Sequence, residues 1–492
     1  MYDLIVLGGG AGGLNVAVAA AAVGAKVALV EKGETGGECT FTACVPSKAL
    51  IRAARFVAEA RRAAEFGIKL APPEVDFAAV MARVRSVVAG FARSDSAEHL
   101  QGRGVEVIRG TAAFDAYDTV LVDGRTPLRG RAFVIATGSR PASPPIPGLD
   151  AVGALDHTTI WGLDALPPEL LILGAGPVGI EFAQAFARLG SRVKVVADSA
   201  HILPREDPEV ADRLQALLEA EGIRFHLGAE VYKASLRDGQ PVLAYRREAD
   251  AFPREVGGSH LLVATGRRAN VEGLNLDAMG IHATAEHGVE VDEHLKTRAA
   301  NVWAVGDVLG HDQFTHAAER EAAVVIQNAL LARDLAPKRM EFATLPRVTF
   351  TDPELAAVGS GQPDGSRTFR VELAELDRAR IDGRAEGLAK LVATPSGKLV
   401  GATILGPEAG ELLPPFVLAL ERGLSLDDLG GLVFAYPTYS ALGRLLANRF
   451  RATRLESGLV RTALRWIYGF KPRAGGDGEV GDSPQRHEEK SK

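Results

Sequence analysis

Apolar residues near the start of the chain form short continuous runs, separated by a stretch with helical spacing. Residues 3–7 (DLIVL) and 26–30 (KVALV) have the length and content of buried parallel strands, and the alanine-rich stretch between them is typical of a helix. The same order returns at 170–174 (LLILG), followed by the helical segment IEFAQAFARLG and the strand-like run RVKVV. Two strand–helix–strand units of this kind predict an α/β fold.

Each unit carries glycines at the turn from its first strand into its helix, in the spacing G-x-G-x-x-G. This spacing lets backbone N–H groups approach a pyrophosphate at the helix N-terminus. Glu31 ends the first unit, where a carboxylate can accept a hydrogen bond from a ribose hydroxyl. Asp198 takes that place in the second unit, with no arginine beside it to receive a 2′-phosphate, which favours a dinucleotide without that phosphate. The turn glycines are Gly8, Gly10 and Gly13, then Gly174, Gly176 and Gly179.

The only two cysteines of the 492 residues, Cys39 and Cys44, lie five positions apart just after the first unit. A C-x4-C pair with no third cysteine or nearby histidine is a poor zinc site, and two buried structural thiols are the alternative. A redox-active disulfide beside a flavin explains the spacing best. The next residues, from Lys48 onward, have helical character, so the first helical turn must be distorted for the sulfur atoms to meet. A helix N-terminus and Lys48 should lower the thiol pKa values.

The stretch Gly36-Gly37-Glu38-Cys39 followed by Cys44 and Pro46-Ser47-Lys48, placed after a nucleotide-binding unit, resembles the class I pyridine nucleotide-disulfide oxidoreductases. Dihydrolipoamide dehydrogenase, glutathione reductase and mercuric reductase belong to that family. The resemblance implies FAD on the first unit and NAD(H) or NADP(H) on the second. It also implies that Cys39 exchanges with substrate, that Cys44 contacts the flavin, and that Lys48 pairs with Glu181 near the flavin.

Three later segments resemble the parts of the family that complete the two nucleotide sites. Residues 133–138 (FVIATG) and 262–267 (LVATGR) match the strand ends that close the two nucleotide domains, and 301–308 (NVWAVGDV) matches the second flavin segment. For FAD the resemblance implies Gly8, Gly10, Gly13, Glu31, Lys32, Gly37, Thr137, Gly138, Gly306 and Asp307. For the nicotinamide nucleotide it implies Gly174, Gly176, Gly179, Asp198 and Gly266.

From about residue 345 the chain resembles the interface domain that builds a homodimer in the family, with LPRVTFTDPELAAVG and KLVGATILGPEAGELL as the matching stretches. The predicted fold is therefore α/β, with two Rossmann-like domains and an α+β dimerisation domain at the C-terminus. A proline-rich hinge at 141–148 marks the first crossing between domains. The expected ranges are 1–148 and 271–340 for FAD, 149–270 for NAD(P), 341–450 for the interface, 451–473 for an extension and 474–492 for a tail.

The chain departs from the family where disulfide-reducing members carry H-x-H-P-T-x-x-E. Here the stretch reads FAYPTYSA, so Tyr436 stands for the acid/base histidine and Ala441 for its glutamate partner, and no histidine lies between 316 and 487. A phenol with a pKa near 10 is a poor base at neutral pH, and loss of a positioned base costs about 10²–10⁴-fold in rate. Tyr436 and Tyr439 either pack at the dimer interface or contact an acceptor.

The expected function is electron transfer from NAD(P)H through FAD to the Cys39–Cys44 disulfide, and on to a small or protein-bound acceptor. A disulfide such as lipoamide, a quinone and a metal ion such as Hg(II) are the candidates. Mercuric reductases use an additional C-terminal cysteine pair, which this chain lacks, and many of them use NADPH, so the choice of nucleotide stays open. A slow, nucleotide-binding sensor flavoprotein is the alternative of another class. No resident metal is expected.

The extension 451–473 places Leu455, Leu459, Ala463, Trp466 and Phe470 on one side of a helical wheel, and Arg454, Arg461 and Arg465 opposite. Such a helix can pack on its own dimer or lie on an anionic membrane. Residues 474–492 have the composition of a disordered tail.

Composition and charge limit the partners. Apolar residues make up 47%, charged residues 24%, and the net charge of −6 does not favour nucleic acid. The chain starts directly in a strand, and no apolar run reaches the length of a membrane span. We therefore expect a cytoplasmic enzyme, either free or peripheral to the inner face of the membrane.

Overall fold

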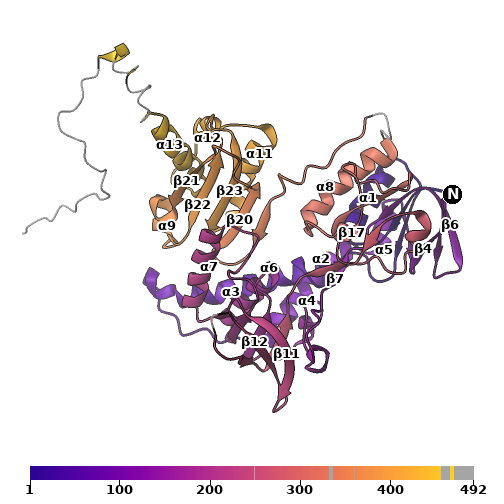
Figure 1. The fold of residues 1–492 in the computed structure, drawn as a ribbon, viewed down its shortest axis with the longest axis horizontal. Coiled ribbons are helices and arrows are strands. Elements are labelled where there is room, and N and C mark those ends of the chain that lie inside the picture. The colour runs from indigo at the N-terminus through magenta and orange to yellow at the C-terminus, as the bar shows by residue number, and fades with distance from the viewer. Residues whose placement is uncertain (249, 332–335, 360, 456–461, 463–465, 470–492) are drawn as a thin grey trace, which may run out of the picture.

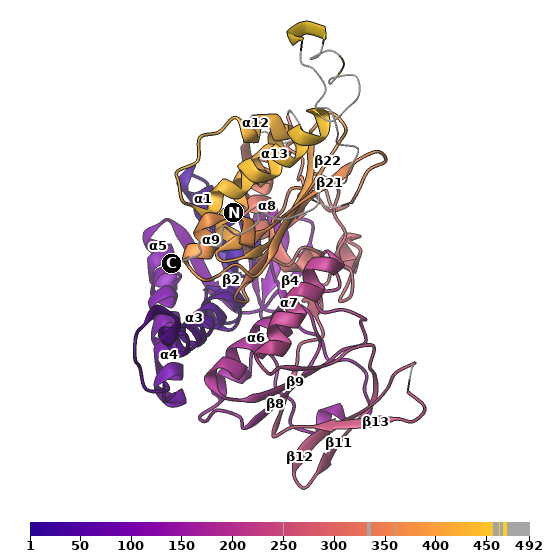
Figure 2. The same cartoon turned by 90° about the vertical axis from the view of Figure 1, so that its left-hand side faces the viewer.

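The computed structural model describes residues 1–248, 250–331, 336–359, 361–455, 462 and 466–469. Figure 1 shows three groups of elements: the N-terminal sheet with α1 and α8 at the right, the second nucleotide unit below, and the C-terminal sheet in the upper part. The view turned by 90° in Figure 2 places α6 and α7 between the C-terminal sheet and the strands β8 and β9.

The first sheet has the order β3-β2-β1-β6-β5-β4, with β18 added beside β6. Its β1, β2, β3, β6 and β18 pair in parallel, with Leu4 opposite Val27 and Trp303 opposite Val134. Because β18 comes from far along the chain, this sheet is completed only after the second nucleotide unit. The strands are β1 (Tyr2–Leu7), β2 (Val27–Glu31), β3 (Val105–Arg109), β4 (Ala112–Ala116), β5 (Thr119–Val122), β6 (Thr126–Ile135) and β18 (Val302–Ala304).

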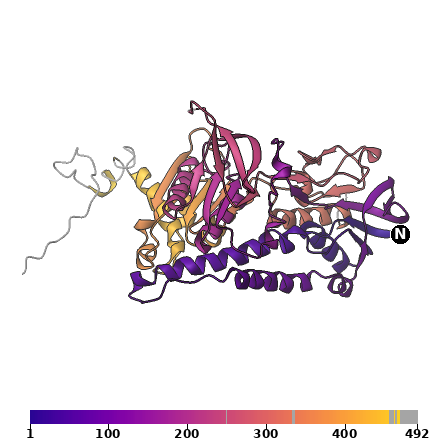
Figure 3. The ribbon, with the colours of Figure 1, turned by 90° about the horizontal axis from the view of Figure 1, so that it is seen from below.

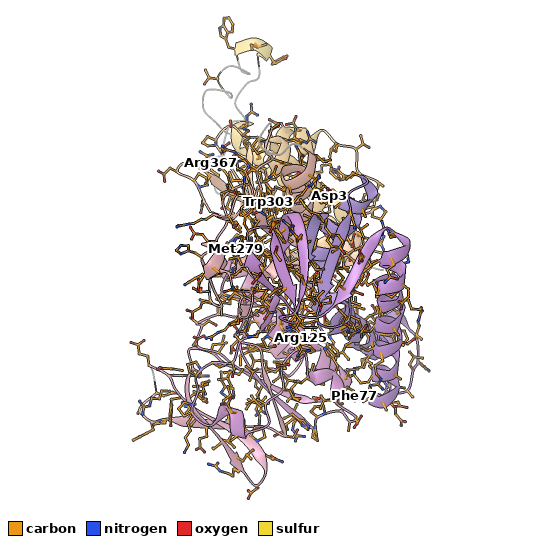
Figure 4. The ribbon with its side chains drawn as sticks, turned by 90° about the vertical axis from the view of Figure 1, so that its right-hand side faces the viewer. Asp3, Phe77, Arg125, Met279, Trp303 and Arg367 are labelled. Atoms are coloured by element: carbon orange, nitrogen blue, oxygen red, sulfur yellow. The ribbon has the colours of Figure 1, made fainter. Side chains whose placement is uncertain are left out.

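Helices α1 (Ala11–Ala22) and α8 (Thr315–Ile326) pack beside each other against the first sheet. Residues Leu4 to Leu7 are at most 1% exposed, as expected for a parallel strand with both faces covered. Figure 4 shows this part of the molecule with side chains, and labels Asp3 of β1, Trp303 of β18 and Phe77, the first residue of α4. Short elements complete this part: α5 (Ala97–Gly102), β16 (Ala283–Thr284) and β17 (Gly288–Val289).

The second unit has a parallel sheet in the order β10-β9-β8-β14. A separate antiparallel sheet, β11-β12-β13, lies beside it, and β7 pairs with β15 where the chain passes between the two nucleotide units. The elements are β7 (Ser139–Pro141), β8 (Glu169–Leu173), α6 (Pro177–Leu189), β9 (Arg192–Val196), α7 (Pro208–Ala220), β10 (Arg224–His226), β11 (Glu230–Arg237), β12 (Gln240–Arg246), β13 (Arg254–Gly257), β14 (His260–Val263) and β15 (Arg267–Ala269).

The C-terminal part is an antiparallel sheet in the order β19-β20-β23-β22-β21, covered by helices. A buried ion pair joins it to the second nucleotide unit, because Arg188 Nη1 of α6 donates to Asp352 Oδ2 at 2.8 Å. The elements are β19 (Arg347–Thr349), β20 (Glu354–Gly359), β21 (Arg367–Glu372), α9 (Asp377–Ile381), β22 (Leu388–Ala393), β23 (Leu399–Gly406), α10 (Ala409–Leu412), α11 (Pro414–Arg422), α12 (Leu426–Gly430) and α13 (Leu442–Leu455).

Two long helices, α3 (Cys44–Arg61) and α4 (Phe77–Ser94), pack against each other and run along one side of the molecule (Figure 3). The short helix α2 (Gly37–Phe41) precedes α3. Helix α3 begins at the redox motif and also packs on α6, so it connects the cysteine region with the second nucleotide unit. Among the described residues, no helix is both long and apolar enough to cross a membrane.

Most of the extension predicted over 451–473 lies outside the described residues. Helix α13 ends at Leu455, and of the residues beyond it only 462 and 466–469 are described. Trp466 is 88% exposed and Ile467 is 63% exposed. The predicted apolar and basic sides of this segment, and the tail 474–492, therefore remain predictions.

Candidate active site

One large cavity, with a volume of about 1640 Å³, lies where the first sheet, helices α2, α3 and α6, and the segment before β19 meet. Most of the residues suggested for the flavin lie on its wall. The two cysteines and the expected Lys48–Glu181 pair lie there too. Those residues are Gly8, Gly10, Glu31, Lys32, Gly37, Cys39, Cys44, Lys48, Thr137, Gly138, Glu181, Gly306 and Asp307. Gly13, the nicotinamide-site glycines, Asp198 and Tyr436 do not line this cavity.

The first glycine turn has the shape that a bound pyrophosphate requires. Gly8 has a φ of +109°, and a Cβ there would lie 2.3 Å from the Ala136 carbonyl oxygen. A Cβ on Gly13 would lie 1.9 Å from the Gly8 carbonyl oxygen, so both positions need glycine for packing. A Cβ on Gly10 would meet only Gly37 Cα, at 3.9 Å. The middle glycine thus borders open space in the cavity, where a ligand phosphate can approach the backbone, and the turn fits a dinucleotide.

The second glycine turn repeats this arrangement at the end of β8. A Cβ on Gly174 would lie 2.3 Å from the Ala264 carbonyl oxygen, and one on Gly179 would lie 2.2 Å from the Gly174 carbonyl oxygen. A Cβ on Gly176 would meet nothing within 4 Å. Asp198 is exposed just beyond the end of β9, and so it lies at the same edge of the parallel sheet as this turn. The second turn also fits a dinucleotide.

Two carboxylates on the cavity wall already have partners in the protein. Glu31 accepts hydrogen bonds from the backbone N–H of Gly9 at 2.6 Å and of Gly33 at 2.7 Å, which ties the end of β2 to the glycine turn. Asp307 Oδ2 accepts from Ser139 Oγ at 2.6 Å. Both carboxylates are held in defined positions on the cavity wall, as recognition of ribose or ribityl hydroxyls would require.

The cysteines lie on two helices and not on one. Cys39 belongs to α2 and Cys44 is the first residue of α3, with non-helical backbone at Ala43 between them (φ −117°, ψ −98°). The expected distortion is therefore a complete break. Both thiols are half-buried and unbonded, and they lie within hydrogen-bonding reach of each other. Thr315 Oγ1 donates to Cys39 Sγ at 3.1 Å and lies 3.5 Å from Cys44 Sγ.

The two thiols differ in acidity, so the expectation that both pKa values are lowered was wrong for Cys39. The hydrogen bond from Cys39 lowers the pKa of Cys44 to about 6, with the Thr315 hydroxyl and the Lys48 charge acting in the same direction against burial. The same hydrogen bond, together with burial, raises the pKa of Cys39 above its ordinary value, because Cys39 keeps the shared proton. At neutral pH the pair therefore carries its thiolate on Cys44.

Lys48 and Glu181 meet on the cavity wall, although they lie 133 positions apart in the sequence. Lys48 Nζ donates to Glu181 Oε2 at 2.8 Å, and the ammonium lies 4.5 Å from the centre of the Phe350 ring. The backbone N–H of Phe350 donates to the other carboxylate oxygen of Glu181 at 2.9 Å. One carboxylate thus joins α3, α6 and the start of the C-terminal sheet at the edge of the cavity.

A second polar cluster on the same wall was not predicted from the sequence. Glu38, which directly precedes Cys39, forms an ion pair with Arg267, and its Oε2 lies 3.2 Å from Nε2 of the buried His157. Arg267 Nη1 lies 2.7 Å from the same His157 nitrogen, and Arg267 Nη2 lies 3.2 Å from Asp307 Oδ2. No local pattern in the sequence indicates this cluster or Thr315, since Glu38, His157 and Arg267 are each at least 110 positions apart and Thr315 is 276 positions from Cys39.

Tyr436 lies outside the cavity and is 72% exposed. Its hydroxyl donates to Asp377 Oδ2 at 3.1 Å, and this bond raises the pKa of Tyr436 above its ordinary value. Desolvation and the neighbouring Asp382 raise the pKa of Tyr439 to about 12. Both phenols are therefore even more completely protonated at neutral pH than free tyrosine, so neither supplies a base there. Among the described residues, no group of three or more His, Cys, Asp or Glu side chains could hold a metal ion.

Comparison with known families agrees with this geometry. The family described as pyridine nucleotide-disulphide oxidoreductase matches residues 2–322, and its dimerisation domain matches residues 345–445. This chain is a pyridine nucleotide-disulfide oxidoreductase of class I. Enzymes of this family use FAD and NAD(P)H, and the matched dimerisation domain makes the chain a homodimer-forming oxidoreductase.

Relatives of this chain include proteins named mercuric reductase and proteins named dihydrolipoyl dehydrogenase. A mercuric reductase of Streptomyces lividans is 38% identical over 91% of this chain and 96% of its own length. Dihydrolipoyl dehydrogenase of Thermus scotoductus is 35% identical over 89% of this chain and 95% of its own length. Among solved structures, the Cu(II) complex of the HOCl-induced flavoprotein disulfide reductase RclA of Escherichia coli has a TM-score of 0.80 at 27% identity, covering 91% of this chain and 99% of that one.

Proposed function

We propose that this oxidoreductase passes electrons from NAD(P)H through FAD and the Cys39–Cys44 disulfide to an acceptor that needs no acid/base group from the protein. The observation that carries this proposal is the state of Tyr436. It stands where disulfide-reducing members have a histidine, and its hydroxyl is bound to Asp377 with a raised pKa. Exchange with a substrate disulfide requires proton transfer to the leaving thiol, which this tyrosine is poorly suited to provide.

The cavity residues are proposed to hold FAD through the Gly8–Gly13 turn, Glu31, Lys32, Gly37, Thr137, Gly138, Gly306 and Asp307. The second glycine turn, with Asp198 and Gly266, is proposed to hold the nicotinamide nucleotide. When bound, FAD supplies the chemistry that accepts a hydride and passes two electrons to a disulfide. In sum, NAD(P)H, one proton and the disulfide give NAD(P)⁺ and two thiols, one of which ionises at neutral pH.

Side chains of the protein stabilise the negative charge and hold the protons during this electron transfer. Lys48, fixed by Glu181, is proposed to place a positive charge beside the flavin edge, where reduction adds negative charge. Cys44, with its pKa of about 6, holds the thiolate, and Cys39 keeps the proton as the thiol that faces the acceptor. These roles follow from the acidity of the two sulfur atoms and from the family pattern.

A soft metal ion is the acceptor that the site favours. Two thiols in one cavity, one of them ionised at neutral pH, are ligands that soft metal ions prefer. Relatives at 38% and 31% identity are named mercuric reductase, and a similar solved structure is described as a Cu(II) complex. A dithiol supplies two electrons, which reduce one Hg(II) to Hg(0) or two Cu(II) to Cu(I), with formation of the Cys39–Cys44 disulfide and release of the thiol protons.

The test is reoxidation after anaerobic reduction with one equivalent of NADH. The reduced enzyme is mixed separately with thiol-bound Hg(II), Cu(II), a soluble quinone and lipoamide, and flavin absorbance is followed. We expect fast reoxidation by the metal ions and a rate with lipoamide that is about 10²–10⁴-fold lower. Equally fast reoxidation by lipoamide would contradict the proposal, and reoxidation by quinone alone would identify a quinone as the acceptor.

Two sets of variants test the role of the disulfide in metal reduction and the effect of the missing acid/base pair on lipoamide reduction. Cys39→Ser and Cys44→Ser should each abolish reduction of metal ions, whereas direct reoxidation of the flavin by quinone should survive. The double variant Tyr436→His/Ala441→Glu restores the histidine–glutamate acid/base pair of the family and should raise the lipoamide rate. Tyr439→His, on the neighbouring turn, is the control for a histidine placed outside that pattern.

NADH is the proposed nucleotide, because the exposed Asp198 just beyond β9 would accept from a ribose hydroxyl and would repel the 2′-phosphate of NADPH. The ratio of kcat/KM for NADH and NADPH should fall in Asp198→Asn. A wild-type preference for NADPH would contradict this assignment.

A peripheral contact with an anionic membrane is proposed for the 451–473 segment, supported by its arginines and by the exposure of Trp466 and Ile467. Co-sedimentation with vesicles of phosphatidylcholine, with and without phosphatidylglycerol, tests it. Binding to the anionic vesicles alone, lost in Trp466→Ala, is expected. Failure to bind, with a dimer weakened by the same substitution, would place this segment on the dimer.

A further inference from the structure

Helix α2, which carries Cys39, has little of its own to hold it in place. It is five residues long, and its N-cap is Gly36, which has no side chain to accept from the first N–H groups. On one side, Thr40 Oγ1 donates to Asp95 Oδ2 at 2.8 Å. Further contacts come from Thr315, which donates to Cys39, from Arg267, which pairs with Glu38, and from a turn at residues 156–161, directly before the second nucleotide sheet.

This turn is rigid and belongs to the nucleotide sheet. Leu155 bridges the edge strand β14, donating to the Leu261 carbonyl and accepting from the Val263 N–H, both at 2.7 Å. Asp156 Oδ1 then accepts from the backbone N–H of Thr158 at 2.8 Å. It also accepts from the N–H of residue 159 at 3.0 Å, which closes the turn. The segment is thus fixed to β14 at its start and folded tightly by one carboxylate.

Two side chains of the turn reach the two ends of the cysteine loop. Trp161 Nε1 donates to two carbonyls: that of His157 within the turn at 2.8 Å, and that of Thr42 at 2.9 Å, between the two cysteines at the break that separates α2 from α3. Arg267 pairs with Glu38, which directly precedes Cys39, and its Nη1 lies 2.7 Å from His157 Nε2. Because arginine can only donate, His157 Nε2 accepts from Arg267 and does not itself donate to the Glu38 carboxylate 3.2 Å away. His157 therefore holds this end of the Cys39 segment through Arg267, and Trp161 holds the other end directly.

The Trp161 ring also packs against the nucleotide-binding helix α6. Its centre lies 5.6 Å from the ring of Phe182, which follows Glu181 in α6 and lines the cavity. One indole group thus connects the break between the cysteine helices with the helix that carries the partner of Lys48. No other described tryptophan has such a position: Trp303 is buried in the first sheet with no partner for its Nε1 (Figure 4), and Trp466 is 88% exposed.

We infer that His157 and Trp161 are positioning residues for the redox disulfide. They hold Cys39 at the distance and orientation that allow its sulfur to bond with Cys44, and they couple that geometry to the nucleotide-binding sheet. The inference rests on the proposed redox role of the two cysteines. Loss of either contact lets the Cys39 segment sample other positions, which lowers the effective concentration of one thiol beside the other and makes the disulfide less stable.

The experiment equilibrates the FAD-loaded protein with glutathione buffers under anaerobic conditions, without nicotinamide nucleotide or acceptor. Two cysteine thiols and one oxidised glutathione give one disulfide and two reduced glutathiones, and thiol counting after an acid quench gives the equilibrium constant. Trp161→Phe keeps the ring against Phe182 and removes the N–H donor. We expect its constant for disulfide formation to fall about 2- to 10-fold, the effect of one neutral hydrogen bond.

Trp303→Phe is the matched control, since its indole nitrogen has no partner to lose and its equilibrium constant should equal that of the wild type. At the other end of the segment, His157→Leu should lower the constant, whereas His157→Gln, whose oxygen can still accept from Arg267, should restore it. The alkylation rate of Cys39 in the reduced protein should rise in the two disruptive variants.

The inference is overturned by a Trp161→Phe constant equal to that of Trp303→Phe, or by equal constants for His157→Leu and His157→Gln. A lower melting temperature without a shift in the equilibrium would also overturn it, because the residues would then only stabilise the fold. Failure of the wild-type cysteines to form a disulfide in any glutathione buffer would instead defeat the proposed function.

Discussion

Thr315 Oγ1 donates a hydrogen bond to Cys39 Sγ at 3.1 Å and also lies 3.5 Å from Cys44 Sγ. One hydroxyl, on the first residue of α8, therefore contacts both sulfur atoms of the pair. A hydroxyl is a neutral donor that can rotate toward whichever sulfur is ionised, so it can stabilise a thiolate without adding a charge to the cavity.

Replacing Thr315 with valine should raise the pKa of Cys44 by about one to two units, because a hydrogen bond to a charged group stabilises it by about 1.5–3 kcal/mol. Valine has the shape of threonine and lacks the hydroxyl. Absorbance of the thiolate near 240 nm, titrated in the reduced protein, measures the change. Thr315→Ser keeps the donor and should titrate as the wild type does, and equal curves for the valine and serine variants would show that the hydroxyl has no such role.

Alkylation of the reduced protein by iodoacetamide should show a rate that rises with pH through about 6 and then levels off. The thiolate is the reactive form, and the pKa of Cys44 is about 6. Cys39, whose pKa is raised, should react slowly over the same range. Mass spectrometry of the labelled peptides assigns each rate. Cys44→Ser should remove the component near pH 6, and a midpoint near 8.5 in the wild type would contradict the assignment.

Glu321 should make the protein less stable as the pH rises toward 7. It is 1% exposed and accepts from the Gly306 N–H at 2.6 Å, and burial raises its pKa to about 7. A raised folded-state pKa means that its contribution to stability is complete below about pH 4.5 and is lost as the pH rises through 7. Integrated over that range, the effect is about 3 kcal/mol.

Glu321→Gln keeps an oxygen for the Gly306 N–H and removes the titration. Its melting temperature should therefore exceed that of the wild type at pH 8 and differ little at pH 5, both measured with FAD bound. Glu319→Gln, at an exposed position on the same helix, is the control and should change neither value. A pH-independent difference between Glu321→Gln and the wild type would show that ionisation of Glu321 is not the cause.

The second glycine turn should tolerate alanine differently at its first and second positions. In Gly174→Ala, the new Cβ would lie 2.3 Å from the Ala264 carbonyl oxygen at a φ of +115°, so both the melting temperature and the affinity for NADH should fall. In Gly176→Ala the Cβ meets nothing in the protein, so the melting temperature should be unchanged.

The KM for NADH should still rise about tenfold or more in Gly176→Ala, because the methyl group occupies the path of the pyrophosphate. FAD content, measured in both variants, controls for effects on the first site. An unchanged KM in Gly176→Ala would place the nucleotide elsewhere.

Local features of the sequence determined the two nucleotide-binding units and the redox motif. A strand, a glycine turn and a helix are defined by residues within about 30 positions of each other, and their periodicity and glycine spacing follow from backbone sterics alone. The departure at Tyr436 was equally visible, because it depends only on which residue occupies a motif position. The break between α2 and α3 was harder to predict from the sequence. The residues around it have good helical character, and only the conformation at Ala43 interrupts the helix.

The tertiary structure decided which side chains meet in the cavity, and of the pairs below only Lys48–Glu181 was expected, from the family resemblance and not from a local pattern. Lys48 and Glu181 are 133 positions apart, Cys39 and Thr315 are 276 apart, and Glu38 and His157 are 119 apart. Each meeting depends on how two sheets and the helices between them pack, which is set by the burial of many apolar residues and not by any local pattern. The acidity of Cys44, the raised pKa of Cys39 and the binding of Tyr436 to Asp377 all follow from those contacts. The sequence therefore determined the family and its cofactor folds, and the packing of distant elements decided the protonation and positioning of the groups that carry the chemistry.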